Sequence, residues 1–234
     1  HPRHPPKSSK GCSMSSPVLG IVCGMQTEAH TMGRKAIVPG VLHTVSGARP
    51  ELAEEGANWL ADQGCRLLVS YGVSGGLDPD LKPGQVLRPQ GVVGPDGVFE
   101  LSHSEDDVTL FGSDQMVLTP DAKQELRART GAAVVDMESH VVARVASERG
   151  LAMAALRAVG DPAGSTLPPF VTAGLSPTGH QRPWPVIWGL IQRPGWLPTL
   201  MQLKKDTDKA LRALTAEVEG GAIDRLLEAV KSNG

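Results

Sequence analysis

Three acidic residues stand at the ends of apolar runs that are typical of buried strands. Glu28 comes soon after the run of residues 18–25, Glu138 follows a short central run, and Asp161 ends the run that begins at Leu151. In open α/β sheets, ligands bind at the carboxyl ends of the strands, so we expect the three side chains to converge there. Carboxyl groups on two sides of a sugar suit the cleavage of a glycosidic bond. That reaction needs a proton donor for the leaving group and a negative group near the oxocarbenium-like sugar.

The central run leads directly into a helical pattern, and this junction allows a second interpretation. The sequence changes at Asp136-Met137-Glu138-Ser139 from small and β-branched apolar residues to a helix with its apolar side chains on one face. Acidic residues also favour the first turn of a helix, where they complement the helix dipole. From the local sequence alone, helix capping explains these two carboxylates as well as catalysis does.

The remaining segments alternate between strand and helix patterns. We expect Leu67–Tyr71 to be a buried strand that ends in a glycine-rich turn, Gly72–Gly76, whose N–H groups could approach an anion or a ribose. Further strands are expected near residues 41–45 and on both sides of a turn at residues 94–97, and residues 103–118 are expected to be a polar loop followed by a short apolar run. Helices are expected at 26–35, at 51–64 with Leu52, Trp59 and Leu60 as apolar markers, from Thr119 as N-cap to Arg129, and at 204–230. This alternation predicts a mostly parallel, three-layer α/β fold.

Composition and charge exclude several classes of protein. The 234 residues carry a formal net charge of -2, and the basic residues are scattered, so no nucleic-acid-binding surface is indicated. Cys12, Cys23 and Cys65 are odd in number and widely spaced, which favours reduced thiols in the cytoplasm over a disulfide framework. No group of residues has metal-ligand spacing, so we expect neither a metal nor an organic cofactor.

The two ends of the sequence differ from the part between them. Residues 1–16 have no apolar core of a signal peptide, and we expect a flexible leader, followed by a single domain over 17–234. Residues 183–203 are apolar and rich in tryptophan but are interrupted by four prolines, so we do not expect them to span a bilayer. They could pack on the core, line an apolar pocket, or lie at a membrane surface.

Four motifs carry a resemblance to a known family. GIVCGMQTEA, SYGVSGGL, VVDMESHVVARV and ALRAVGDPA, in this order over residues 18–163, resemble the nucleoside phosphorylase/nucleosidase superfamily, including the methylthioadenosine/S-adenosylhomocysteine nucleosidases. The resemblance implies a three-layer nucleoside-phosphorylase-like fold with a central mixed, mostly parallel sheet flanked by helices. It also implies a homodimer or larger assembly.

The resemblance also implies roles for individual residues. Glu138 matches the carboxylate that grips the ribose hydroxyls, Asp161 the acid that protonates the purine, and Glu28 the group that orients the attacking water. The implied substrate-binding residues are Met137 against the ribose, Met116 and Val117 on an adenine-reading strand, and Ser74, Gly75 and Gly76 beside the nucleophile. Candidate phosphate contacts are Ser46, Arg49 and Ser74.

Some positions depart from the pattern of the superfamily. Gly160 stands where the nucleosidases carry a serine before the catalytic aspartate, and Pro162 follows that aspartate. Ser70 and Val73 stand where phosphorolytic relatives carry an arginine and a serine. The acceptor, water or inorganic phosphate as co-substrate, therefore stays open.

The segments SYGVSGGLDPDLKPG, FGSDQMVLTP and GDPAGSTLPP, together with the apolar tail, resemble the hopanoid-associated phosphorylases. That resemblance implies cleavage of adenosylhopane to adenine and a ribosyl- or phosphoribosyl-hopane. A substrate of this kind predicts a cytoplasmic protein that meets the inner membrane peripherally. The alternatives are a nucleosidase for small methylthioadenosine-type nucleosides and a non-catalytic binder of nucleosides or lipids.

Overall fold

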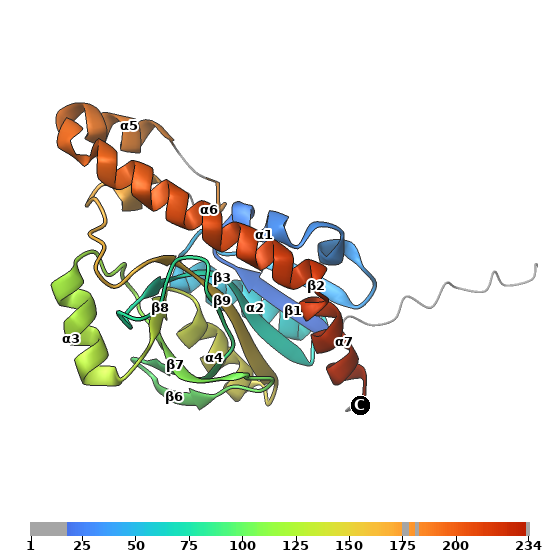
Figure 1. Cartoon of the computed structure of the whole chain (residues 1–234). Coiled ribbons are helices and arrows are strands. Elements are labelled where there is room, and N and C mark those ends of the chain that lie inside the picture. Colours follow the sequence, from blue (N-terminus) through green and yellow to red (C-terminus); the bar gives the residue numbers. More distant parts are fainter. Residues whose placement is uncertain (1–17, 175–177, 181–182, 233–234) are drawn as a thin grey trace, which may run out of the picture.

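The structure is a computed structural model that describes residues 18–174, 178–180 and 183–232. The expected leader at residues 1–16, and Cys12 within it, lie outside the described residues. Cys23 and Cys65 are both free and buried. Figure 1 shows a sheet with helices on two sides and one long helix running across it.

The described residues form one mixed sheet, in which the strands follow the order β2-β1-β3-β8-β7-β5-β6 and β9 pairs with β3 and β4. The strands β1 and β2, β1 and β3, β3 and β9, β5 and β7, and β7 and β8 pair in parallel, whereas three pairs are antiparallel. The strands are β1 (Leu19–Cys23), β2 (Val41–Val45), β3 (Leu67–Gly76), β4 (Val86–Leu87), β5 (Pro89–Gly94), β6 (Gly97–Glu100), β7 (Asp106–Gly112), β8 (Val134–Asp136) and β9 (Ala152–Asp161).

Helices cover both faces of this sheet. They are α1 (Gln26–Thr31), α2 (Pro50–Asp62), α3 (Pro120–Thr130), α4 (Ser139–Glu148), α5 (Pro183–Gln192), α6 (Leu197–Glu219) and α7 (Ala222–Ser232), with short 3-10 helices η1 (Gly33–Ile37), η2 (Val171–Gly174) and η3 (Pro194–Trp196). Alternate residues of β1 point to opposite faces, as the pleat of a strand requires. Ile21 packs with α1, α6 and α7, whereas Val22 packs with α2 and α4. The predicted three-layer arrangement around a mostly parallel sheet is thus confirmed.

Local signals that the sequence carries explain several element boundaries. Thr119 caps α3, since its Oγ1 accepts a hydrogen bond from the N–H of Ala122 at 3.2 Å, and Gly131 ends the helix with a left-handed φ of 71°. The turn at residues 94–97 joins β5 to β6 as predicted. On α2, however, Trp59 is 46% exposed, and the buried face consists of Ala53, Ala57 and Leu60. The prediction that Trp59 marks the apolar face was wrong.

The glycine-rich segment after Tyr71 is not a turn. Residues 72–76 continue β3, pair with β9 through a register shift between Ser74 and Gly75, and pair with β8 on the other side. Backbone pairing with two neighbouring strands outweighs the weak strand propensity of glycine here, because every N–H and C=O of a buried segment needs a partner.

Two further predictions need correction. Residues 106–112 form β7, which the sequence analysis read as loop, and residues 113–118, with Met116 and Val117, are a loop rather than a strand. The final helix predicted over residues 204–230 is two helices, because Gly220 and Gly221 interrupt it between α6 and α7.

The tryptophan-rich segment forms α5, η3 and the start of α6, and Figure 1 shows α5 beside the end of α6 that lies away from the sheet. No side chain described between residues 185 and 203 is buried. Five large apolar side chains of this segment are exposed, between 41% and 65%: Ile187, Trp188, Ile191, Leu197 and Met201. We call these five residues the apolar surface. In the part of the chain that the structure describes, each helix is too short or too polar to cross a membrane.

Candidate functional site

A cavity of about 170 Å³ lies where the last residues of β3, β8 and β9 meet the first turn of α1. It brings together Glu28, Glu138 and Asp161, of which the first and the last are 133 positions apart in the sequence. Its lining also includes Gly24, Met25, Ala48, Val73, Ser74, Gly75, Gln115, Met116, Val117, Val135, Asp136, Met137 and Leu167.

Glu28 is held in place by backbone groups. Its Oε2 accepts a hydrogen bond from the N–H of Met25 at 2.8 Å, and its Oε1 accepts one from the N–H of Val73 at 2.8 Å. Two glycines leave room for the carboxylate: a Cβ on Gly72 would lie 2.5 Å from Glu28 Cδ, and one on Gly24 would lie between Glu28 and Glu138. Gly72 has a φ of 152°, which residues other than glycine rarely adopt. These glycines therefore allow two carboxylates to approach the same space.

The two acids at the start of α4 have separate functions. Asp136 is the cap, because its Oδ1 accepts hydrogen bonds from the N–H groups of Glu138 at 3.2 Å and of Ser139 at 2.9 Å. Glu138 makes no capping hydrogen bond and lines the cavity instead. Capping therefore explains Asp136 but not Glu138, whose role in catalysis stays a prediction.

Arg157 on β9 lies beneath the two carboxylates and is fully buried. Its Nη2 lies 2.7 Å from Asp136 Oδ2 and 3.2 Å from Glu138 Oε2, and it donates a short hydrogen bond to Ser70 Oγ. Burial, the largest single influence, favours its neutral form, but Asp136, Glu138 and Glu28 together raise the pKa of Arg157. This arginine is a permanent cation that partly compensates the negative charge of the acids.

The charge of the acids exceeds what this one arginine can balance. Burial raises the pKa of Glu28, against the opposing influence of Arg157 and of the N–H groups of Val73 and Met25. Burial also raises the pKa of Glu138 to about 8; Arg157 opposes this shift, while the charges of Asp136 and Glu28 add to it. Near neutral pH the cavity therefore contains at least one carboxyl that holds a proton and can release it, as acid–base chemistry requires.

Asp161 ends β9 on another side of the cavity and is paired with a buried lysine. Lys123 on α3 is fully buried, and its Nζ donates a short hydrogen bond to Asp161 Oδ2 and further bonds to the carbonyl oxygens of Pro162 at 3.0 Å and Ser165 at 3.3 Å. Burial raises the pKa of Asp161, and Lys123 opposes that shift. The residue before Asp161 is Gly160, which has no side chain that could bind this carboxyl in place of Lys123. A side chain is excluded there, because a Cβ on Gly160 would overlap Val73 Cγ1.

The other predicted site residues divide into two groups. Met116, Val117, Met137, Ser74 and Gly75 line the cavity, and the Oγ of Ser74 is buried without a hydrogen-bond partner. Three do not line it: Gly76, where a Cβ would lie 3.2 Å from the carbonyl oxygen of Asp161, Ser46, which is buried in the turn after β2, and Arg49, which is exposed at the N-cap of α2.

Lys123 and Arg157 belong to the site but were not predicted from the sequence. Arg157 interrupts the apolar run of β9, and a charge inside a buried strand requires a partner of opposite charge. Lys123 lies in the first turn of α3, where the helix dipole disfavours a cation. Each signal is weak alone, but each marks a charge in an unfavourable place.

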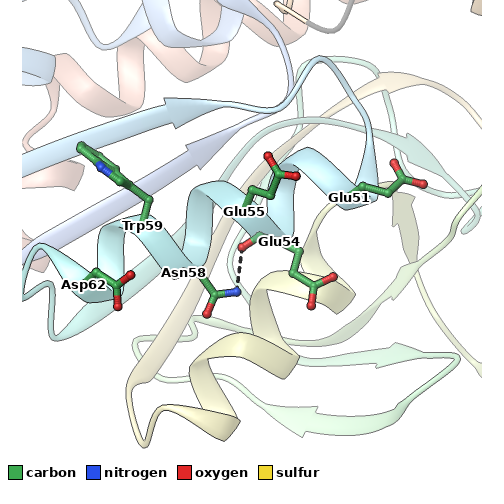
Figure 2. Close-up of a pocket in the computed structure, with 6 residues that line it drawn as sticks. All are labelled: Glu51, Glu54, Glu55, Asn58, Trp59 and Asp62. Carbon is green, nitrogen blue, oxygen red and sulfur yellow. Dashed lines mark hydrogen bonds between the residues drawn. The ribbon is translucent and has the colours of Figure 1, made fainter.

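A larger hollow of about 540 Å³ lies elsewhere, along the surface of α2. Figure 2 shows the residues that line it, all from this one helix: Glu51, Glu54, Glu55, Asn58, Trp59 and Asp62. A hollow lined by a single helix leaves most of any small ligand in water, whereas binding sites bury most of the ligand. The smaller cavity is therefore the candidate site.

Comparisons with known proteins identify the fold. Residues 106–173, which include β8, α4 and β9, match the Phosphorylase superfamily. No curated protein matches the chain in sequence. Among solved structures, futalosine hydrolase of Helicobacter pylori has a TM-score of 0.66 at 16% identity, over 91% of this chain and 100% of that chain.

Two nucleosidases are also similar to the chain in fold. The 5'-methylthioadenosine/S-adenosyl homocysteine nucleosidase of Helicobacter pylori has a TM-score of 0.65 at 16% identity, over 90% of this chain and 99% of that one. The corresponding enzyme of Neisseria meningitidis, in complex with methylthio-immucillin-A, has a TM-score of 0.57 at 14% identity, over 86% and 98%. The chain has the nucleoside phosphorylase/nucleosidase fold. Within that fold, its cavity places a buried carboxyl–lysine pair on one side and two carboxyls over an arginine on the other.

Proposed function

We propose that the chain cleaves the N-glycosidic bond of an adenine nucleoside. The proposal rests on one observation: Glu28, Glu138 and Asp161 line a single cavity although they come from three distant segments. Cleavage of such a bond needs a proton for the departing purine and negative charge near the sugar, where positive charge develops. Asp161 is assigned the first function, Glu138 the second, and Glu28 the orientation of the attacking group.

Water is the acceptor that the charge distribution favours. Four acidic residues line the cavity, namely Glu28, Asp136, Glu138 and Asp161, whereas Arg157 and Lys123 are buried behind them. Those of the four that are ionised would repel an incoming phosphate, and the residues that line the cavity include no lysine, arginine or histidine to bind it. Of the candidate phosphate contacts, Ser46 and Arg49 do not line the cavity. We therefore propose hydrolysis, with Ser74 near the water rather than near a phosphate.

The substrate that we propose is adenosylhopane, in which the ribose carries a large apolar group. A second cavity of about 310 Å³ shares Asp161 and Leu167 with the site, and its far wall is the start of α6 from Pro198 to Asp206. The apolar surface lies on α5 and the start of α6, and its large side chains are exposed to solvent. Exposed apolar patches of this kind mark binding or membrane surfaces. We propose that this surface meets the inner membrane and receives the lipid.

A small methylthioadenosine-type nucleoside is the second candidate. It is favoured by the similarity in fold to the methylthioadenosine/S-adenosylhomocysteine nucleosidases. It does not explain the apolar surface, since a small substrate needs no such area.

Adenine release separates these proposals. The chain is incubated with adenosylhopane in phospholipid vesicles or with 5'-methylthioadenosine, each with and without inorganic phosphate. We expect rapid release from adenosylhopane at a rate independent of phosphate. Faster release from 5'-methylthioadenosine would favour the second candidate, a phosphate requirement would exclude hydrolysis, and tight binding without release would identify a non-catalytic binder.

A matched pair of variants tests the substrate assignment further. Trp188→Ser with Ile191→Ser removes two members of the apolar surface, whereas Val98→Ser changes an apolar side chain that is 74% exposed on β6. We expect the first variant to lower the rate on vesicle-bound substrate at least tenfold and to leave the cleavage of a soluble nucleoside unchanged. The Val98 variant should match the unaltered chain on both substrates.

A further inference from the structure

The pair formed by Lys123 and Asp161 differs from an ordinary surface ion pair in its burial. The side chain of Lys123 is 1% exposed and that of Asp161 is 13% exposed. The lysine donates to three oxygens, so its ammonium is fully hydrogen-bonded, and within the described residues it gives Asp161 its one side-chain hydrogen bond. Asp161 faces the cavity, whereas Lys123 lies behind it.

Stability alone gives little reason for such a pair. Replacing a buried ion pair by apolar residues of similar volume is often neutral or stabilising, because both charges have lost their hydration. The position also opposes the helix dipole, since Lys123 lies in the first turn of α3. A charged group that is kept at an unfavourable position next to the acid of a site suggests a role in the chemistry of that site.

We propose that Lys123 is the positioning residue of Asp161 and that the two side chains together hold the proton that passes to the leaving purine. This inference rests on the proposed function. In the step, the bond between the sugar C1' and the purine nitrogen breaks, and its electron pair moves into the purine ring. A ring nitrogen takes the proton from Asp161, and Asp161 takes one from Lys123 Nζ, which becomes a neutral amine.

The remaining atoms balance through the acceptor. Water adds its oxygen to C1' and gives one proton to Glu28, which then releases it to solvent. After adenine leaves, Asp161 is open to the cavity, and Lys123 regains its proton through it. Lysine can act in this way because its ammonium can lose a proton, whereas a guanidinium keeps its own at any accessible pH.

Other charges around Asp161 act on the same equilibrium. The buried Asp206 on α6 raises the pKa of Asp161. Asp206 accepts a hydrogen bond from the side-chain amide of Gln202 at 2.9 Å and lies 3.9 Å from Lys209 Nζ. Glu28 and Glu138 line the same cavity. These groups are unchanged in the variants below, so differences between the variants report on Lys123.

Two substitutions distinguish a proton-holding pair from a structural contact. In Lys123→Met, Asp161 alone must hold the proton, so activity should be lost at the pH where that carboxyl ionises. We expect the alkaline limb of kcat/KM for adenine release to move to lower pH by more than one unit. In Lys123→Arg the positive charge remains but its proton cannot be transferred, so we expect lower activity than in the Met variant at the acidic end of the profile.

A purely structural role predicts the reverse. Arginine would then restore activity better than methionine, and the alkaline limb of the Met variant would stay in place; either result would overturn the inference. Lys204→Met removes a lysine that is 75% exposed on α6 and serves as the matched control. Circular dichroism and the midpoint of thermal unfolding report whether each variant folds. If the Arg variant does not fold, the alkaline limb of the pH profile of the Met variant alone tests the inference. A wild-type chain that releases no adenine would contradict the proposed function instead.

Discussion

Two of the acidic hollows among the described residues differ in size, and the larger of these two is not the candidate site. The hollow along α2 measures about 540 Å³ and is lined by one helix, whereas the cavity at the strand ends measures about 170 Å³ and is lined by residues from distant segments. On α2 the side chains of Glu54 and Asp62 are 42% and 62% exposed and pair with surface arginines. In the cavity, Glu28 and Glu138 are 5% and 4% exposed.

This difference shows why burial matters more than volume or the number of acids. An exposed carboxylate is solvated by water and interacts weakly with its neighbours. A buried carboxylate has lost that hydration, so neighbouring charges and hydrogen bonds decide its protonation state. In the cavity, burial raises the pKa of both Glu28 and Glu138.

The largest effect is expected for Asp161→Asn. An amide cannot donate an acidic proton, so we expect kcat for adenine release to fall about 10³-fold, within the usual contribution of general acid catalysis. KM should change much less. A variant that retains kcat within tenfold would show that Asp161 is not the proton donor.

The design of this variant must account for Lys123. Asp161→Asn leaves a buried ammonium without its counter-ion, which can destabilise the fold by about 3–5 kcal/mol. The double variant with Lys123→Met removes both charges and provides the control. If the double variant is stable and also inactive, the loss of activity is due to chemistry and not to unfolding.

Glu138→Gln should have the next largest effect. We expect kcat/KM to fall about 10²-fold, because the amide stays neutral, whereas the carboxyl can lose its proton and stabilise positive charge on the sugar. The folded pKa of Glu138 is about 8, above the value of 4.5 in the unfolded chain, so the folded state keeps a proton that the unfolded state releases. Between these pH values the free energy of unfolding of the unaltered chain therefore decreases as pH rises.

The glutamine variant lacks this titration. Its thermal stability relative to the unaltered chain should increase as pH rises towards 8 and remain constant above it. Melting curves between pH 5 and 9 provide the measurement. A stability difference that does not depend on pH would mean that Glu138 is not a buried, proton-binding carboxyl in the folded state.

The two regions also differ in how far the sequence could predict them. Strand ends predicted Glu28, Glu138 and Asp161 as one group, because parallel strands bring their carboxyl ends to a common edge. The cap at Thr119 and the hairpin turn at residues 94–97 were equally predictable, since their signals are local.

What the sequence did not predict depends on contacts between distant segments. The glycines after Tyr71 extend β3 because β8 and β9 supply partners for their backbone, and no local pattern encodes those partners. From the sequence alone, Lys123 resembles any exposed lysine of a helix. Its burial follows from its contact with Asp161, which is 38 positions away. Trp59 suggested a buried face by its size, but the smaller Ala53 and Ala57 fit against the sheet.

Gly72→Ala tests whether the cavity depends on close packing. The new methyl group would lie 2.5 Å from Glu28 Cδ at a φ of 152°, so we expect a loss of about 2 kcal/mol in the free energy of unfolding. Activity should fall as well, because Glu28 must move. Gly164→Ala is the control, as no atom lies within 4 Å of its new Cβ. Equal stability of the two variants in urea denaturation would contradict this packing.

The smallest effect is expected on α2. Glu51→Gln and Glu55→Gln together remove two charges from the larger hollow (Figure 2), and both side chains are exposed. We expect kcat/KM to stay within twofold and the free energy of unfolding within about 0.5 kcal/mol, as is usual for surface positions. The same adenine-release assay and melting curves provide the measurement. A tenfold loss of activity would mean that exposed acids reach the reaction through an assembly or a partner, and burial would then no longer be sufficient to distinguish the two hollows.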